Sequence, residues 1–348
     1  MRLVVASASL FTVAVLVAGC GSAGAPRAPM SELADKEPGD ALLTIEGTPI
    51  ALRRSVVADE YFWLRTKVLE GDAPAGFVEA FNAMHDLRTD LSADPTAYED
   101  LEVPLGAVSH ASELVAIYGE LPERKDVGGR SIPFRADALR LALAMSAGES
   151  AFKRGPYREH AAAIAVAAKD LGTHLVPFEA TILKAIESDM GLPDGARAIV
   201  VTLVHDAPYP GIFAADARGR VMASFVRVRG LDGSALAETV LHESLHALDE
   251  MTVRESTALN SLRAALAKRG IDESDSNAEM AINTVTSAEA ASLVRRFVDP
   301  SHRALGERGF YTLYPPAPAI VEAWSRHVDH GEGLDATADA IAKAVTDP

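Results

Sequence analysis

One short segment contains residues whose types and spacing suit metal chemistry, His242-Glu243-x-x-His246. An α-helix turns by about 100° per residue, so two histidines four positions apart lie on one face of a helix. Their imidazoles can bind one metal ion from the same side. Glu243, rotated by about 100°, can reach a water on that ion without being a ligand. The pattern predicts a metal site with His242 and His246 as ligands and Glu243 beside a metal-bound water. The alternative without chemistry is a surface helix with two solvated histidines.

The residues around this segment predict the elements that position it. Residues 235–250 are rich in apolar positions and lack Pro and Gly, and Ser234 precedes them as an N-cap residue. Residues 197–205 are rich in β-branched types and predict a buried strand, and a hairpin is expected around 216–219. Most other segments have helical spacing. The fold class predicted is therefore α+β and mostly helical, with a small β-sheet followed by the motif helix and further C-terminal helices.

The motif His242-Glu243-Ser244-Leu245-His246 resembles the signature of the zincin metallopeptidases, and a small sheet before the signature helix is similar to that fold. The close resemblance covers the helix itself and, in element order, roughly residues 195–298. It implies a Zn²⁺ ion with a third protein ligand and a water that Glu243 deprotonates. It also implies a peptide or protein substrate paired to an edge strand, a role that would fall to residues 224–228.

The third ligand is the least determined part of the predicted site. The metzincin branch has a third histidine six residues after the motif, where this chain has Thr252, so that branch is excluded. The gluzincin branch uses a glutamate on a following helix, and the predicted helix 276–297 offers Glu279 and Glu289. Glu289 shares its face with apolar residues, where an ionised carboxylate is costly unless it is paired or bound to metal. We therefore favour Glu289, and Glu279 or another residue remains possible.

Other polar residues are weaker candidates for a role in the predicted site. Asp249 and Glu238 lie near the face of the two histidines, where a carboxylate can accept a ring N–H, and Asp249 is the preferred of the two. Four residues are candidates for stabilising the oxyanion: Tyr311, Tyr314, His327 and His330. Six histidines have no partner at ligand spacing and are expected to have no role in chemistry: His85, His110, His160, His174, His205 and His302.

The N-terminus predicts export and a lipid anchor. Met1-Arg2 is followed by an apolar run that ends in Leu16-Val17-Ala18-Gly19-Cys20, similar to the lipobox of bacterial lipoproteins. The resemblance implies cleavage of residues 1–19, lipidation of Cys20 and a location in the cell envelope. In a Gram-negative host the location would be the outer membrane. An ordinary cleaved signal peptide with an incidental cysteine is the alternative. Residues 20–40 are rich in Gly, Ala, Pro and Ser and predict a flexible tether.

Composition limits the remaining possibilities. The net charge of −16 argues against binding to nucleic acid and against adhesion to anionic lipid through a basic face. Beyond the tether we expect a helical region at 41–190 and a zincin-like domain at 191–348. The function predicted is that of a membrane-anchored zinc metallohydrolase, in particular a peptidase. The alternatives are a non-catalytic zincin-like lipoprotein that serves as a binding or scaffold module, and a zinc hydrolase acting on a non-peptide bond.

Overall fold

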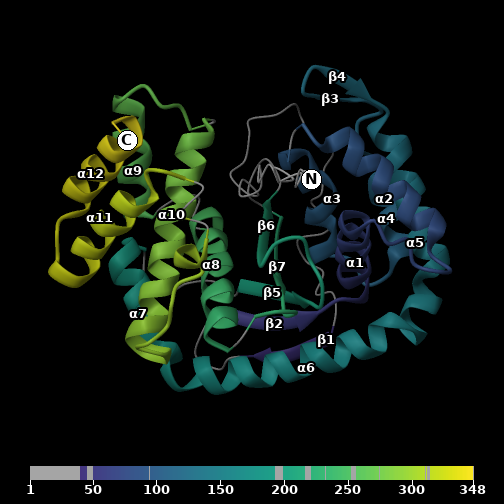
Figure 1. Ribbon diagram of the computed structural model, residues 1–348, viewed down its shortest axis with the longest axis horizontal. Helices are drawn as coiled ribbons and strands as arrows, with labels where there is room; N and C mark the ends of the chain where they lie inside the picture. The colour runs from purple at the N-terminus through teal and green to yellow at the C-terminus, as the bar shows by residue number, and fades with distance from the viewer. Residues whose placement is uncertain are drawn as a thin grey trace, which may run out of the picture.

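The computed structural model describes residues 40–44, 50–93, 95–192, 199–215, 221–231, 233–251, 256–273, 275–309, 311 and 314–347. The lipobox, Cys20, residues 21–39 and the turn at 216–220 lie outside the described residues. The chain is α+β and mostly helical, as predicted, with a small mixed sheet at its centre (Figure 1).

The central sheet has the strand order β1-β2-β5-β7-β6. Its strands are β1 (Asp40–Thr44), β2 (Ile50–Arg54), β5 (Ile199–Val204), β6 (Gly211–Ala215) and β7 (Met222–Arg227). Strand β5 runs parallel to β2 and to β7, whereas β6 runs antiparallel to β7. The predicted strand and hairpin are thus confirmed. Because β7 is paired on both sides, it is not an edge strand, and the expectation that residues 224–228 form the edge is wrong. Among the described strands, β6 occupies that edge.

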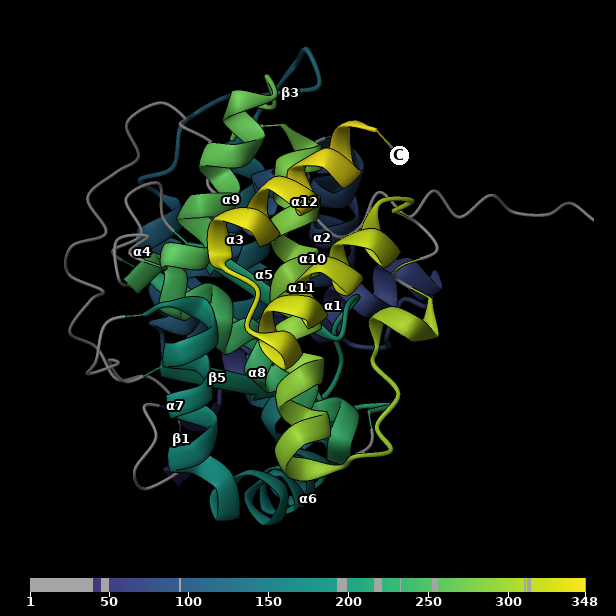
Figure 2. The same ribbon diagram turned by 90° about the vertical axis from the view of Figure 1, so that its left-hand side faces the viewer.

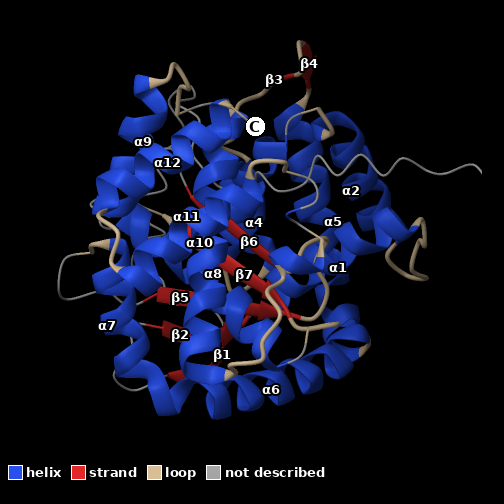
Figure 3. Ribbon diagram, turned by 60° about the vertical axis from the view of Figure 1, so that its left-hand side comes forward, coloured by secondary structure: helices blue, strands red, loops and turns tan. Residues whose placement is uncertain are grey.

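Helices cover both faces of the sheet, so the strands lie between two helical layers (Figure 3). Side chains that alternate along β7 divide between the two layers: Phe225 belongs to one apolar core and Val226 to the other. This alternation follows from the two-residue period of a strand. The sheet is therefore shared by two cores.

The core that contains Phe225 is built from the first helices. These are α1 (Val56–Glu70), α2 (Val78–Leu91), α3 (Glu99–Glu102), α4 (Ala111–Tyr118) and α5 (Phe134–Arg154), with the small hairpin β3 (Lys125–Val127) and β4 (Arg130–Ile132) beside them. Helix α1 begins where the Ser55 hydroxyl accepts the Ala58 N–H, and it ends at Gly71, whose φ of 70° is left-handed.

The core that contains Val226 is built from later helices. These are α6 (Pro156–Leu175), α7 (Glu179–Met190), α8 (Gly233–Met251), α9 (Thr257–Lys268), α10 (Ser276–Leu293), α11 (Ala317–His330) and α12 (Leu334–Thr346). Figure 2 shows α9 to α12 gathered on one side of the molecule. Within the described ranges, no helix combines the length and the apolar character needed to span a membrane.

Helix α6 continues through Gly172 to Leu175, and its apolar face stays buried through Leu171 and Leu175. The expected boundary after residue 190 falls inside a shared core. Strand β2 pairs with β5, and Ile186 and Met190 of α7 pack in the same cluster as Leu259 of α9. The N-terminal strands therefore complete the sheet that precedes the motif helix.

Candidate metal centre

Helix α8 places the motif directly against the sheet. Its apolar residues Leu241, Leu245 and Leu248 are buried in the core. The ring of Phe213 on β6 stacks on the ring of His246, with centroids 5.8 Å apart and planes inclined by 22°. The predicted motif helix is thus confirmed and extends from Gly233 to Met251.

The two motif histidines converge as a metal pair would. Nε2 of His242 lies 3.2 Å from Nε2 of His246, and the two rings are perpendicular. Burial lowers the pKa of both imidazoles, and for His242 the neighbouring His246 lowers the pKa further. Both rings are therefore neutral near pH 7, which is the form that binds a metal. Donors on a tetrahedral zinc ion with bonds of about 2.0–2.1 Å are separated by about 3.3–3.4 Å, close to the observed spacing.

Glu243 lies beside this pair in an enclosed position. Its side chain is 5% exposed, and Oε1 is 3.8 Å from Nε2 of His242. Burial raises the pKa of Glu243 to about 8. Its Oε2 is buried and has no hydrogen-bond partner among the described residues. The carboxyl packs against Gly211 of β6, where a β-carbon would overlap Oε1. A glycine at this edge therefore leaves the room that Glu243 occupies.

Helix α10 contributes the other polar groups at the histidines. Oδ1 of Asn283 is 3.3 Å from Nε2 of His246, and the Thr286 hydroxyl is 3.4 Å from the same nitrogen. The Ser287 hydroxyl is 3.4 Å from Nδ1 of His242. These residues recur at helical spacing, so one face of α10 is turned to α8. Sequence reasoning missed them because polar residues on a helix usually face solvent.

The structure does not bring Glu289 to the histidines. Glu289 is fully buried, as its apolar face predicted, but its Oε2 accepts the indole N–H of Trp324 at 2.9 Å and its Oε1 pairs with Arg296 at 3.2 Å. Burial, followed by the charge of Asp189, raises the pKa of Glu289. The physical reason is that α10 is buried on two sides. Glu289 lies about 120° around the helix from Asn283, on the side that meets α11.

Glu279 is half-buried near the start of α10. Among the described residues, one group of His, Cys, Asp or Glu side chains has three ligand atoms within 4.8 Å of one another, and it contains neither motif histidine. Neither Glu279 nor Glu289 therefore completes a carboxylate-containing ligand set with His242 and His246 in this structure.

The two candidate supporting carboxylates have different neighbours. Glu238 accepts Nε2–H of His302 at 2.6 Å and the backbone N–H of Leu305 at 2.9 Å, so it anchors the segment after α10. His302, expected to have no role in chemistry, is thus part of a buried structural pair. Asp249 forms an ion pair with Arg263 of α9. The negative charge of Asp249 also acts to raise the pKa of His246 against the larger effect of burial.

The expected oxyanion candidates take part in helix packing. The Tyr314 hydroxyl donates to the backbone oxygen of Asn277 at 3.2 Å. His327 is 2.6 Å from the backbone oxygen of Glu332 and 3.0 Å from that of Asp189. Burial raises the pKa of Tyr311, whose ring lies against Gly306. The structure shows no bond from His330 to the motif.

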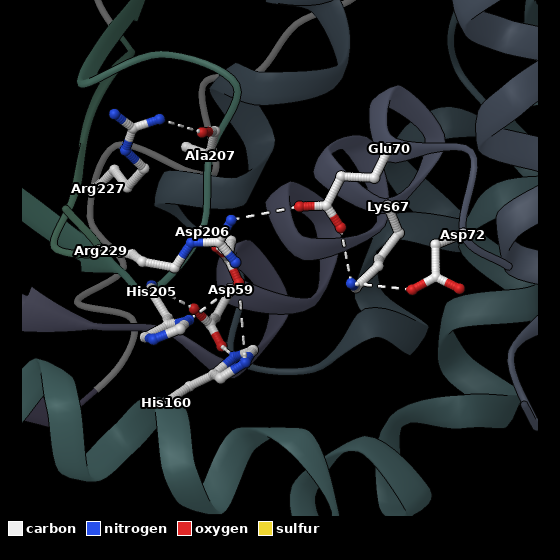
Figure 4. A network of polar contacts seen from close by, with 10 residues as sticks. All are labelled: Asp59, Lys67, Glu70, Asp72, His160, His205, Asp206, Ala207, Arg227 and Arg229. Atoms are coloured by element: carbon white, nitrogen blue, oxygen red, sulfur yellow. Dashed lines mark hydrogen bonds and ion pairs between the residues drawn. The ribbon is translucent and has the colours of Figure 1, made fainter. Parts of the chain in front are cut away.

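A second histidine cluster was not anticipated (Figure 4). His160 of α6 and His205, which follows β5, stack with ring centroids 4.2 Å apart. Nδ1 of His160 donates to Asp59 at 2.6 Å, and Nδ1 of His205 donates to Asp206 at 2.9 Å. The tertiary structure alone unites His160 with His205, which are far apart in sequence, so no ligand spacing along the chain indicates this cluster.

This cluster fits a metal less well than the motif does. Ligand atoms of His160, His205 and Asp206 lie within 4.8 Å of one another, so the group could hold an ion. However, imidazole lone pairs lie in the ring plane, and these planes are inclined by only 13° in a stack, so one ring would have to rotate to share an ion. Arg229 already pairs with Asp206 at 2.9 Å. We therefore regard the cluster as an ion-paired junction between elements.

Comparison of the chain with family models, with curated proteins and with solved structures finds no match. The case for function therefore rests on the convergence of His242, His246 and Glu243 beside the sheet.

Proposed function

We propose that this protein is a zinc-dependent hydrolase, in particular a peptidase. One observation carries the proposal: two neutral imidazoles on one face of a buried helix present their Nε2 atoms 3.2 Å apart, with the Glu243 carboxyl beside them. Two histidines alone can occur without metal. A buried glutamate with an unpartnered oxygen at the same place is costly, and a catalytic role accounts for retaining it.

Each motif residue has a distinct part in this proposal. His242 and His246 would hold a zinc ion through Nε2, and the ion would supply Lewis acidity that lowers the pKa of water towards about 7. The positive charge of a bound ion would favour the ionised form of Glu243, whose carboxylate could then take the proton of the attacking water and return it to the leaving amine. The packing of Glu243 against Gly211 fixes where that proton is held.

The sheet edge supports a peptide as the substrate class. Strand β6 is the terminal described strand on this side, and its first residue, Gly211, contacts Glu243. An extended peptide added to β6 would form main-chain hydrogen bonds and pass beside the base. This assignment moves the proposed substrate strand from β7 to β6.

A second candidate is a non-catalytic metal-binding or scaffold module. The observation that favours it is the placement of Glu289, whose oxygens bind Trp324 and Arg296 instead of completing a ligand set. Such a protein would bind metal without hydrolysing peptides.

Metal content and peptide hydrolysis of the full-length chain, purified in detergent, test both candidates. We expect about one zinc per chain in the wild type and none when both His242 and His246 are changed to Ala. Glu243→Gln should retain zinc and lose about 10²-fold or more in hydrolysis of a peptide library. Metal without hydrolysis would support the module instead. Absence of zinc from the wild type after zinc is supplied would refute the hydrolase.

We also propose that lipid on Cys20 tethers the chain to a membrane of the cell envelope. Loss of residues 1–19 removes one arginine and no acidic residue, so the net charge of −16 becomes about −17. A surface of this charge repels anionic lipid, and the acyl chains would have to supply the attachment. Cys20→Ser should move the protein from the detergent phase to the aqueous phase in a detergent-partition assay. Retention of the variant in the detergent phase would argue against a lipid anchor at Cys20.

A further inference from the structure

We infer that the side-chain carbonyl of Asn283 is the third protein donor of the metal site, where a carboxylate was expected. The inference rests on the proposed metal site at His242 and His246 and adds the identity of the donor that completes it. The resulting ligand set is neutral and has two imidazoles and one amide oxygen.

The positions of the donor atoms support this assignment. Oδ1 of Asn283 lies 3.3 Å from Nε2 of His246, and the two Nε2 atoms are 3.2 Å apart. Three donors around one tetrahedral ion are separated by about 3.3–3.4 Å. The Asn283 oxygen therefore lies at ligand spacing from His246, whereas neither Glu279 nor Glu289 forms a ligand set with the two histidines.

The phase of α10 explains why the donor is an asparagine. Asn283 and Ser287 are four residues apart and face α8 together, one at Nε2 of His246 and the other at Nδ1 of His242. Glu289 is directed to Trp324 on α11. Asn283 is 8% exposed, so its amide is enclosed with the histidines rather than solvated.

Thr286 is the competing donor on the same face. Its hydroxyl lies 3.4 Å from Nε2 of His246 but is also within hydrogen-bond distance of the backbone oxygens of Ile282, at 3.2 Å, and Asn283, at 3.0 Å. Its proton is thus used within the helix, and a neutral alcohol is a weaker ligand than an amide carbonyl. Thr286 is therefore the matched control for Asn283.

A neutral ligand set has a measurable consequence. A carboxylate at the third position would add a negative charge next to the ion, and the interaction between opposite charges is strong in a buried site. With an amide there, the ion keeps its full charge but is held less tightly. The wild-type site should consequently exchange its metal more readily than the variant Asn283→Asp, which has the same carbon skeleton.

The test is the dissociation constant of Zn²⁺ for the full-length chain in detergent, measured by competition with a chromogenic chelator. We expect Asn283→Asp to bind Zn²⁺ at least about tenfold more tightly than the wild type, a difference of about 1.4 kcal/mol. Asn283→Leu, which fills similar space without a donor, should bind at least about tenfold more weakly. Thr286→Val should stay within about threefold of the wild type. Melting curves without metal show whether each variant folds.

The visible absorption of bound Co²⁺ is a second readout, because replacing an amide donor should shift its bands in Asn283→Asp but not in Thr286→Val. Unchanged Zn²⁺ affinity in Asn283→Leu, with binding still abolished by His242→Ala, would overturn the role of Asn283 and leave the proposed function intact. Absence of Zn²⁺ binding by the wild type and Asn283→Asp alike would instead refute the proposed metal site itself.

Discussion

Three buried glutamates of this protein differ in the partners of their carboxyl oxygens. Glu243 lies beside two imidazoles with one oxygen unpartnered, Glu289 has an indole N–H and a guanidinium as partners, and Glu60 on α1 has no hydrogen-bond partner at either oxygen among the described residues. Burial is the largest cause that raises the pKa of each. What a buried carboxyl does therefore depends on what its oxygens face.

Gly211→Ala tests the enclosure of Glu243. The added β-carbon would overlap the Glu243 carboxyl, so Glu243 must move while His242 and His246 remain on their helix. We expect zinc content to stay near that of the wild type and peptide hydrolysis to fall by about 10-fold or more. Gly230→Ala, at a glycine with no atoms near its would-be β-carbon, is a control for glycine loss, although its φ of 80° adds strain. Equal hydrolysis by Gly211→Ala and the wild type would contradict the contact.

Glu60 predicts a pH dependence of stability. Burial, then the charges of Glu149 and Asp59, raise the pKa of Glu60 from 4.5 to about 8. The unfolded chain releases this proton at lower pH than the folded chain does. The stability contribution is therefore complete below about pH 4.5 and is lost as the pH rises to about 8.

Glu60→Gln should remove this dependence, because a buried amide has no proton to lose. Relative to the wild type, the variant should gain on the order of 3 kcal/mol in free energy of unfolding between pH 5 and pH 8. Urea denaturation at several pH values measures the difference. A constant offset between the two proteins across this range would show that Glu60 does not titrate as inferred.

At the scale of elements, α10 is a helix with two buried faces. One face presents Asn283 and Ser287 to α8, and the other presents Glu289 to α11. A π-helical turn, Val294–Val298, extends the helix and carries Arg296, which reaches both Glu289 and Asp189. The helix thus supports the metal site on one side and joins α7 to α11 on the other.

Glu289→Ala should separate these two roles. It leaves the Trp324 N–H and Arg296 without their buried partner, so the free energy of unfolding should fall by about 2–4 kcal/mol. Zinc affinity should remain within about threefold of the wild type, because Glu289 is not at the histidines. Urea denaturation and chelator competition measure the two quantities. Loss of zinc from a folded Glu289→Ala protein would restore Glu289 as a ligand.

At the scale of the molecule, the sheet joins the two helical layers. Phe225 and Val226 of β7 contribute to different cores, and Asp59 of α1 binds both His160 of α6 and the backbone N–H of His205 after β5. Figure 4 shows these groups meeting at one junction. Because both layers pack on the same sheet and meet at the Asp59 junction, we expect one cooperative unfolding transition.

The two tryptophans test this expectation, because Trp63 is buried in one core and Trp324 in the other. The variant Trp63→Phe leaves Trp324 as the fluorescent probe of the core that contains Val226. The variant Trp324→Phe leaves Trp63 as the probe of the core that contains Phe225. In each variant the fluorescence midpoint should coincide with that of far-ultraviolet circular dichroism. Asp59→Ala should lower the free energy of unfolding by about 3 kcal/mol. The fluorescence and circular-dichroism midpoints should shift together. Separate midpoints within one variant would show that the layers unfold independently.

The sequence by itself determined the local parts of this protein. Helical and strand periods predicted the motif helix, the strand before it and the hairpin, because these patterns depend on residues close in the chain. The same local geometry placed His242 and His246 on one face. Burial of Glu289 also followed from its apolar neighbours on the helix.

Only the tertiary structure decided which partners those residues meet. Helical phase shows that a face is buried but not which neighbouring helix covers it. The tertiary structure places Glu289 against Trp324 and Asn283 against His246. Strand order likewise depends on long-range pairing, which placed β7 inside the sheet and β6 at its edge. The stack of His160 on His205 joins segments with no common local pattern. Contacts between distant segments arise from the packing of whole elements, and no short sequence pattern contains that information.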